Sequence, residues 1–274
     1  MSEATFLQAI RAAPDDDLPR LVYADWLEER GDPRGEFIRL QCQDALNPTL
    51  GVATRIAELE AEFGLEWAGP LEERFSRYRF RRGFVEPFID PTTYLSIADA
   101  LERTTKYVSV HIQPTSSVHR ETLEALAKSP AATHVRSLLL GHEWPLNAGV
   151  AALCESPYFQ QLVLLDLHSG GLTDAGCIAL AETWKLPALR HLDLVNNEIA
   201  STGAGALATS VHRRGLQRLN LSHNPIGEAG VEALIRSPCL NDLSQLLVIG
   251  IGIDGRTRLG RALRRRFGDV VVWR

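Results

Sequence analysis

The stretch "LRHLDLVNNEIASTGAGALA", Leu189–Ala208, decides the fold because close copies of it recur along the chain at a fixed spacing. "LQRLNLSHNPIGEAGVEALI" begins at Leu216, and "LVLLDLHSGGLTDAGCIALA" begins at Leu162. Successive copies are thus about 27 residues apart, and a period of roughly 20 to 50 residues is typical of folds in which one structural unit is stacked many times. We therefore expect a repeat architecture.

The spacing extends over most of the chain. Apolar residues fill most of the fourth positions of the unit, which are Phe84, His111, Leu138, Leu165, Leu192, Leu219, Leu246 and Trp273. Alanine fills the eighteenth position at Ala98, Ala125, Ala152, Ala179, Ala206 and Ala233. Apolar residues alternate around the fourth and sixth positions, as in a strand with one buried face, and small or apolar residues follow at helical spacing. Each unit is predicted to be a short strand followed by a helix.

One strand and one helix cannot bury their apolar faces alone, whereas stacked copies can, so the sequence predicts an α/β solenoid with about 27 residues per unit. The pattern LxxLxLxxNxIxxxGxxxLA resembles the leucine-rich repeat, specifically the long ribonuclease-inhibitor-like type. That resemblance implies parallel strands on a concave face and helices on a convex face. It also implies that Asn197 and Asn224 tie their turns to neighbouring backbone, whereas Glu143, Gly170 and Ile251 replace that asparagine in other units.

Residues 1–70 do not follow the period and are predicted to be helical. We expect one helix from Leu18 to Arg30, ended by Gly31, a second begun by Asp32 and Pro33, and a third running from Asn47 to Phe63. The apolar stripe of the first of these helices is predicted to comprise Leu18, Leu21, Val22 and Trp26.

"PDDDLPRLVYADWLEERGDPRGEFIRLQ", Pro14–Gln41, resembles the repeat-companion domain that precedes leucine-rich repeats in certain bacterial proteins. "RRGFVEPF", Arg81–Phe88, resembles the join between that domain and the repeats. The resemblance implies an architecture and no chemistry. We predict a helical capping domain over residues 1–70 and a solenoid over residues 71–274, with degraded first and last repeats.

The charged residues of the opening segment admit two interpretations. Asp25, Glu28 and Glu29 could form an acid/base cluster, or they could lie on a solvated helix face paired with the arginines Arg30, Arg34 and Arg39. No histidine, serine nucleophile motif or phosphate loop accompanies these carboxylates, which favours the solvated face.

The composition places few further limits on function. The chain is 45% hydrophobic with a formal net charge of −5, has no apolar run long enough to span a membrane, and starts without a secretion signal. The four cysteines, Cys42, Cys154, Cys177 and Cys239, are widely spaced, which is typical of reduced thiols. We expect a cytoplasmic, monomeric protein without a cofactor.

The side chains that alternate with the core leucines are predicted to form the functional surface. They vary between units while the core hardly varies, so we predict a non-enzymatic scaffold that binds an unidentified protein partner on the concave face. The predicted partner-binding residues are Arg136, His142, Asp166, His168, Arg190, His191, Asp193, Asn196, Arg218, Asn220 and His223.

Two alternatives stay open at this point. The first is a metal-dependent hydrolase, because Asp166, His168, His191 and Asp193 are ligand types that suit zinc or manganese. The second is a nucleic-acid adaptor that uses the arginine-rich segment "GRTRLGRALRRRF", residues 255–267, in which Arg258, Arg261 and Arg265 share a helix face. The acidic balance of the whole chain makes nucleic acid the weaker candidate, and the simpler interpretation of this segment is a solvated closing helix whose buried side is Leu259, Leu263 and Phe267.

Overall fold

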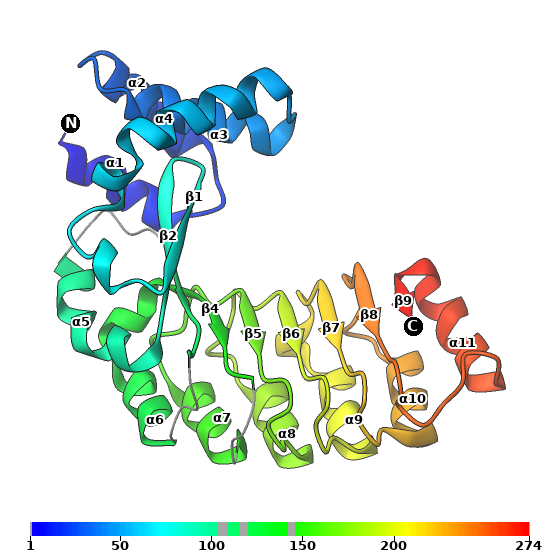
Figure 1. Cartoon of the computed structure of the whole chain (residues 1–274). Helices are drawn as coiled ribbons and strands as arrows, with labels where there is room; N and C mark the ends of the chain where they lie inside the picture. Colours follow the sequence, from blue (N-terminus) through cyan, green and yellow to red (C-terminus); the bar gives the residue numbers. More distant parts are fainter. Residues whose placement is uncertain (1, 104–108, 116–119, 142–145, 274) are drawn as a thin grey trace. The chain divides into compact units, whose positions relative to one another are not determined.

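The computed structural model describes residues 2–103, 109–115, 120–141 and 146–273 (Figure 1). The chain divides into two compact units, Met1–His111 and Ile112–Arg274, which we call unit 1 and unit 2. The sequence-based boundary after residue 70 lies earlier than this division. It remains a prediction about domain organisation, because it marks where the helical segment ends and not where compact packing ends.

Unit 1 consists of helices and one β-hairpin. The helices are α1 (Glu3–Ala12), α2 (Leu18–Glu28), α3 (Arg34–Leu46), α4 (Leu50–Ala68) and α5 (Pro91–Arg103), and the strands are β1 (Arg77–Arg81), β2 (Phe84–Ile89) and β3 (Val110–Ile112), which reaches the boundary of the unit. The segment Glu72–Arg74 forms a short 3-10 helix. The backbone N–H of Arg34 donates to the Asp32 carboxylate, 2.9 Å away, at the start of α3. The third predicted helix begins later than expected, because Thr49 caps α4 by accepting from the Val52 N–H, and it continues to Ala68.

The core of unit 1 differs from the predicted stripe on α2. Leu18 and Val22 are 66% and 45% exposed, whereas the same helix buries Tyr23, Ala24 and Leu27. The prediction was wrong for Leu18 and Val22 only, because Leu21 and Trp26 do pack against the core. The aromatic cluster of Phe6, Tyr23, Trp26 and Phe84 sets the buried face of α2.

The β1–β2 hairpin depends on a two-residue turn with left-handed backbone. Arg82 and Gly83 have φ values of 52° and 80°, a pair that suits the twist of a tight hairpin. A Cβ atom on Gly83 would lie 2.1 Å from the Cγ1 atom of Ile38, so glycine also allows the turn to pack directly on α3.

Unit 2 contains parallel strands that follow one another in sequence order, with helices packed along one side of them (Figure 1). The strands are β4 (Val135–Leu139), β5 (Leu164–Asp166), β6 (His191–Asp193), β7 (Arg218–Asn220), β8 (Gln245–Leu247) and β9 (Val271–Val272). The helices are α6 (Arg120–Lys128), α7 (Leu146–Glu155), α8 (Asp174–Glu182), α9 (Ser201–Thr209), α10 (Gly227–Arg236) and α11 (Arg258–Phe267). Three 3-10 helices precede β4, β7 and β9, at Pro130–His134, Val211–Arg213 and Gly268–Val270. Parallel strands alternating with many helices form an α/β repeat fold.

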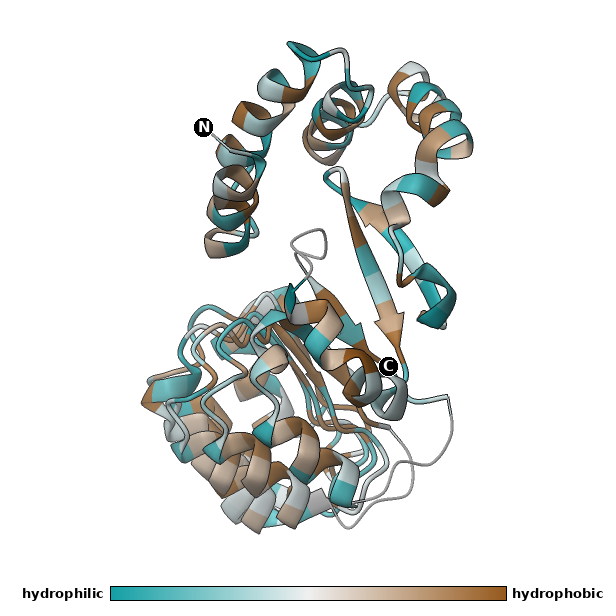
Figure 2. Cartoon of the chain, turned by 90° about the vertical axis from the view of Figure 1, so that its left-hand side faces the viewer, coloured by the Kyte–Doolittle hydropathy of each residue, from teal (hydrophilic) through white to brown (hydrophobic). Residues whose placement is uncertain are grey.

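The strand register brings equivalent residues side by side. Leu165 pairs with both Leu138 and Leu192, and Leu219 pairs with both Leu192 and Leu246, so the register from β4 to β8 repeats the spacing of the sequence. The last strand departs from this spacing, because Val271 and not Trp273 is the partner of Leu246. The central leucine of each strand from β5 to β8 is at most 2% exposed, whereas its two neighbours are half-buried or exposed. Figure 2 shows brown, hydrophobic segments among the strands of unit 2.

A row of buried hydroxyl groups joins successive units at the ends of their helices. The hydroxyl of Ser156 donates to the Ala127 carbonyl at 2.6 Å, and the hydroxyl of Thr183 donates to the Cys154 carbonyl at 2.6 Å. Ser210 and Ser237 make the same bond to the carbonyls of Ala181 and Ala208, always 29 residues earlier. Each hydroxyl therefore satisfies a carbonyl at the end of the preceding helix.

Candidate functional site

The side chains that flank the central leucines of β4 to β8 lie on the side of the sheet away from those leucines. We call this surface the strand face and define it as Ser137, Leu139, Leu164, Asp166, His191, Asp193, Arg218, Asn220, Gln245 and Leu247. Its centre contains a hollow of about 150 Å³, lined by Leu139, Leu164, Asp166, His191, Leu192, Asp193, Arg218, Asn220 and Leu247. The hollow is polar in the middle and apolar at both ends.

The polar centre begins with a row of three side chains on neighbouring strands, in which Asp166 pairs with Asp193 and Asp193 pairs with Asn220. A side-chain oxygen of each accepts from the backbone N–H two residues later, at 3.0 Å, 3.0 Å and 3.1 Å respectively. The Asn220 amide also donates to the second Asp193 oxygen at 2.9 Å. Since Asn220 makes the same backbone bond as the two aspartates, that bond does not require a negative charge.

His168 is held at one edge of this row. Its Nδ1 atom lies 2.7 Å from the Asp166 carboxylate that also accepts from its backbone N–H. The ring lies over Gly141, where a Cβ atom would come 1.8 Å from the imidazole Cε1 atom. Glycine at that position therefore gives the imidazole its place on the neighbouring unit.

His191 lies beside the row in a more buried and positive environment. Burial lowers the pKa of His191, and the positive charges of Arg218 and then Arg190 lower it further. Its Nδ1 atom is buried and makes no hydrogen bond within the described part of the chain. The lowered pKa favours the neutral form of this imidazole.

The structure separates the predicted partner-binding residues into several groups. Those that line the hollow are Asp166, His191, Asp193, Arg218 and Asn220. Asn196 and His223 are exposed in the turns that follow β6 and β7, both with positive φ, and Asn196 donates to the Ser169 hydroxyl at 3.0 Å.

The remaining predicted residues contribute differently. Arg136 is only 6% exposed, so it is a buried side chain and not a displayed one. Arg190 is half-buried and donates to the carbonyls of Pro187 and Leu189, at the entry to β6. Arg136 lies near the start of β4 and Arg190 directly precedes β6, and alternation alone did not reveal how they pack there. His142 lies outside the described residues.

The predicted turn asparagines are confirmed as ties between units. The Asn197 oxygen accepts from the backbone N–H groups of Gly170 and Leu172 at 3.0 Å and 2.9 Å. Asn224 accepts from Ile199 at 3.1 Å and donates to the Leu194 carbonyl at 2.8 Å. The Asn147 oxygen accepts from the backbone N–H groups of Thr173 and Gly176, both at 3.1 Å, and so ties the start of α8 to the preceding repeat.

The ligand set suggested for a metal ion on the strand face is only partly assembled. Of its four members, Asp166 and His168 are in direct contact. Over the residues that the structure describes, no three His, Cys, Asp or Glu side chains are grouped so as to hold a metal ion.

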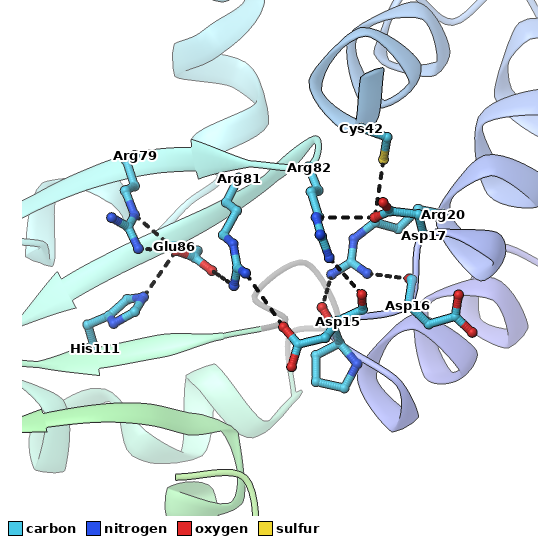
Figure 3. A network of polar contacts seen from close by, with 11 residues as sticks. Asp15, Asp16, Asp17, Arg20, Cys42, Arg79, Arg81, Arg82, Glu86 and His111 are labelled. Atoms are coloured by element: carbon cyan, nitrogen blue, oxygen red, sulfur yellow. Dashed lines mark hydrogen bonds and ion pairs between the residues drawn. The ribbon is translucent and has the colours of Figure 1, made fainter. Parts of the chain in front are cut away.

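Unit 1 contains a second polar cluster, which sequence analysis missed (Figure 3). Glu86 is 3% exposed and accepts from Arg79 at 2.8 Å and 3.0 Å, while the Nε2 atom of His111 lies 3.2 Å away. Burial alone would raise the pKa of Glu86, but the hydrogen bond and charge of His111, followed by the hydrogen bond of Arg79 and the charge of Arg81, lower it to about 2. The signal in the sequence was the alternating "RYRFR" of β1 followed by a two-residue turn, which places Arg79 opposite Glu86.

The cluster continues to the segment between α1 and α2. Arg81 pairs with Asp15 at 3.5 Å, and Arg82 pairs with Asp17 at 3.2 Å. Arg20 is 3% exposed and donates to the backbone carbonyls of Pro14 and Asp16, both at 2.7 Å. The ion pairs join the hairpin to the segment between α1 and α2 (Figure 3). The cluster therefore has a structural role within unit 1.

The acidic residues of α2 lie on a solvated and ion-paired face. Arg39 contacts both Asp25 and Glu28, the latter at 3.1 Å, and Arg30 lies 3.7 Å from Glu29. Arg34 departs from the predicted pairing, because it is 5% exposed and its guanidinium lies 5.2 Å from the centre of the Phe84 ring.

The arginine-rich segment forms α11, whose Thr257 cap accepts from the Gly260 N–H at 3.1 Å. Leu263 is fully buried, whereas Leu259 and Phe267 are half-buried. Arg258, Arg261 and Arg265 are exposed, as the sequence predicted. Across the described residues, no helix has the length and apolar character needed to cross a membrane.

Comparison with protein families matches two segments of unit 2. Residues 185–208 and 215–234 match the family model described as Leucine Rich repeat. They include the strands β6 and β7 and most of the helices α9 and α10 that follow them. A comparison with curated proteins finds no significant match. The match and the parallel repeat fold together support leucine-rich repeats in this part of the chain.

Proposed function

We propose that this chain is a non-enzymatic interaction module that binds a protein partner through the strand face of unit 2. Leucine-rich repeats are generally protein-interaction modules. The observation that carries the proposal is the contrast between the two sides of each strand. Leu165, Leu192 and Leu219 are buried and identical, whereas their neighbours differ in charge, size and polarity from one strand to the next.

The hollow supports this proposal through its chemistry. It combines apolar ends with a centre that offers two carboxylates, one amide, one exposed arginine and one neutral histidine. Such a mixture suits a polar interface in which a group of the partner sits in the hollow. It suits binding by net charge alone less well. Neither a metal-dependent hydrolase nor a nucleic-acid adaptor receives comparable support, and neither is proposed.

The proposed architecture is a solenoid of ribonuclease-inhibitor-like units, each of about 27 residues, with the strand face as its concave side. The equal sequence separation of strand partners from β4 to β8 supports this proposal. We further propose that residues 1–70 form a bacterial repeat-companion domain that caps the first repeat.

We propose a reducing, cytoplasmic setting for this chain, which its four free, buried cysteines support. We also propose a monomeric state without cofactor, which sedimentation of the purified chain would test.

The test is affinity capture with matched double variants. In the first, Asp193→Asn and Arg218→Glu change the strand face while the amide at position 193 can still accept the backbone bond that Asn220 makes on the next strand. In the control, Glu232→Gln and Arg236→Glu make the same charge changes on α10, where these residues form an ion pair at 3.3 Å.

Partners of the strand face should be lost from the first variant and kept by the control, as quantified by mass spectrometry of the captured proteins. Equal melting temperatures would show that both variants are folded. Capture that survives the first variant and disappears in the control would place the interface on the helical side and refute the proposal.

A further inference from the structure

The end of unit 2 contains a second hollow, which is distinct from the strand face. It measures about 490 Å³ and is lined by Val248, Gly250, Ile253, Asp254, Gly255, Arg256, Arg264 and Trp273. We call it the C-terminal hollow. It gathers residues that follow β8, residues of the segment before α11, one residue of α11 and the residue after β9. The arginine-rich segment noted in the sequence contributes part of its wall.

Glycines allow an aromatic wall to form. A Cβ atom on Gly255 would lie 3.3 Å from the Trp273 indole, so the ring packs closely against this glycine. Gly250 and Gly252 have φ values of 63° and 82°, which only glycine adopts readily. The backbone around the hollow is thus shaped by residues without side chains, and this leaves space beside the indole.

The polar groups of the hollow are mostly hydrogen-bond donors. The side chains of Arg256 and Arg264 are exposed, and within the described residues neither guanidinium makes an ion pair or a hydrogen bond. The indole Nε1 atom of Trp273 is buried and has no hydrogen-bond partner in the same set. The single carboxylate, on Asp254, already accepts from the Arg256 N–H at 2.7 Å.

We propose that the C-terminal hollow binds a small aromatic anion, with a phosphate or carboxylate group on the arginines and a flat ring against Trp273. Guanidinium groups match the geometry of phosphate and carboxylate, and an indole N–H can only donate. With two positive charges and one negative charge among its lining residues, the hollow has an excess of one positive charge. This site is independent of the protein-binding function proposed for the strand face.

The experiment uses the full chain labelled with 5-fluorotryptophan and observed by ¹⁹F NMR. The chain has five tryptophans, and Trp273→Phe identifies the resonance of interest. Phenyl phosphate and benzoate distinguish the two kinds of anion, inorganic phosphate tests the anion alone, and benzyl alcohol tests the ring alone. At least one aromatic anion should shift the Trp273 resonance saturably, whereas benzyl alcohol should not.

Matched variants locate the anion. Arg256→Gln and Arg264→Gln should each weaken binding at least about tenfold, because each removes a charged hydrogen bond. Arg265→Gln removes the same charge from α11 but lines a different hollow, between α10 and α11, and should leave binding unchanged.

An unmoved Trp273 resonance, equal shifts of all five resonances, or equal weakening by Arg265→Gln would overturn the proposal. A short single-stranded oligonucleotide that binds more tightly than phenyl phosphate and depends on Arg265 would also overturn it, in favour of a nucleic-acid surface.

Discussion

The side-chain amide of Asn197 donates to the carbonyl of Leu167, 2.9 Å away and 30 residues earlier in the chain. The same amide nitrogen donates to the Leu194 carbonyl at 3.0 Å, and its oxygen accepts from Gly170 and Leu172. One buried side chain therefore satisfies backbone groups from two successive units.

Asn197→Ala should destabilise the chain by roughly 2–4 kcal/mol, because several buried backbone groups would lose their partners at once. Urea denaturation followed by circular dichroism measures this change. The control is Asn196→Gly at the exposed neighbour, whose φ of 57° glycine adopts without strain. If both variants unfold at the same urea concentration, Asn197 is not a tie between units.

Thr183→Val should cost about 1–2 kcal/mol, since it keeps the shape of the side chain but removes the hydroxyl that satisfies the Cys154 carbonyl. Thr183→Ser retains that hydroxyl and should lose less stability. Denaturation midpoints of the two variants provide the comparison. A serine variant as unstable as the valine variant would show that the methyl group, and not the hydroxyl, matters.

The sequence predicted the repeat fold well because the fixed spacing of Leu165, Leu192 and Leu219 is a direct consequence of strand register. It also located the turn asparagines Asn197 and Asn224, because they occupy the same position of the repeat pattern. The spacing was a poorer guide to strand partners and side-chain burial where packing between distant parts of the chain determines them. It placed Trp273 beside Leu246, although Val271 takes that position, and it did not show that Arg136 is buried.

The candidate site shows the same limit. Alternation along a strand predicts that Asp166, Asp193 and Asn220 share a face. It cannot predict the hollow between them, because its depth depends on side chains from several strands at once. The 27-residue spacing aligned His111 with Phe84, whereas His111 contacts Glu86, two residues further along β2, so the spacing alone did not predict this contact.

Glu86→Gln should destabilise the chain at pH 7 and lose this effect in acid. The folded pKa of Glu86, about 2, lies below the ordinary value of 4.5, so its ionised form stabilises the fold above about pH 4.5. That contribution disappears as the pH falls toward 2, and it amounts to at most about 3 kcal/mol. The measurement is urea denaturation of both proteins between pH 2.5 and about 7.

The control for Glu86→Gln is Glu36→Gln. Glu36 forms an exposed ion pair with Arg55 at 2.8 Å, so its loss should change stability much less. A constant difference between the parent and Glu86→Gln at all pH values would contradict the linkage, because it would show that charge on Glu86 is irrelevant.

His191 should titrate below its ordinary pKa of 6.5, and Arg218→Gln should raise that pKa. Burial is the largest cause of the lowered pKa, so the variant should recover only part of the difference, whereas removal of a positive charge must favour protonation. Proton NMR of the imidazole Cε1–H signal over a pH series measures the midpoint, with His191→Asn to assign the signal among eight histidines.

The control is Arg214→Gln, which removes an exposed arginine that does not line the hollow and should leave the midpoint of the His191 titration unchanged. A midpoint at or above 6.5 that Arg218→Gln does not move would show that Arg218 points away from His191 in solution, and the polar centre of the strand face would then need a different arrangement.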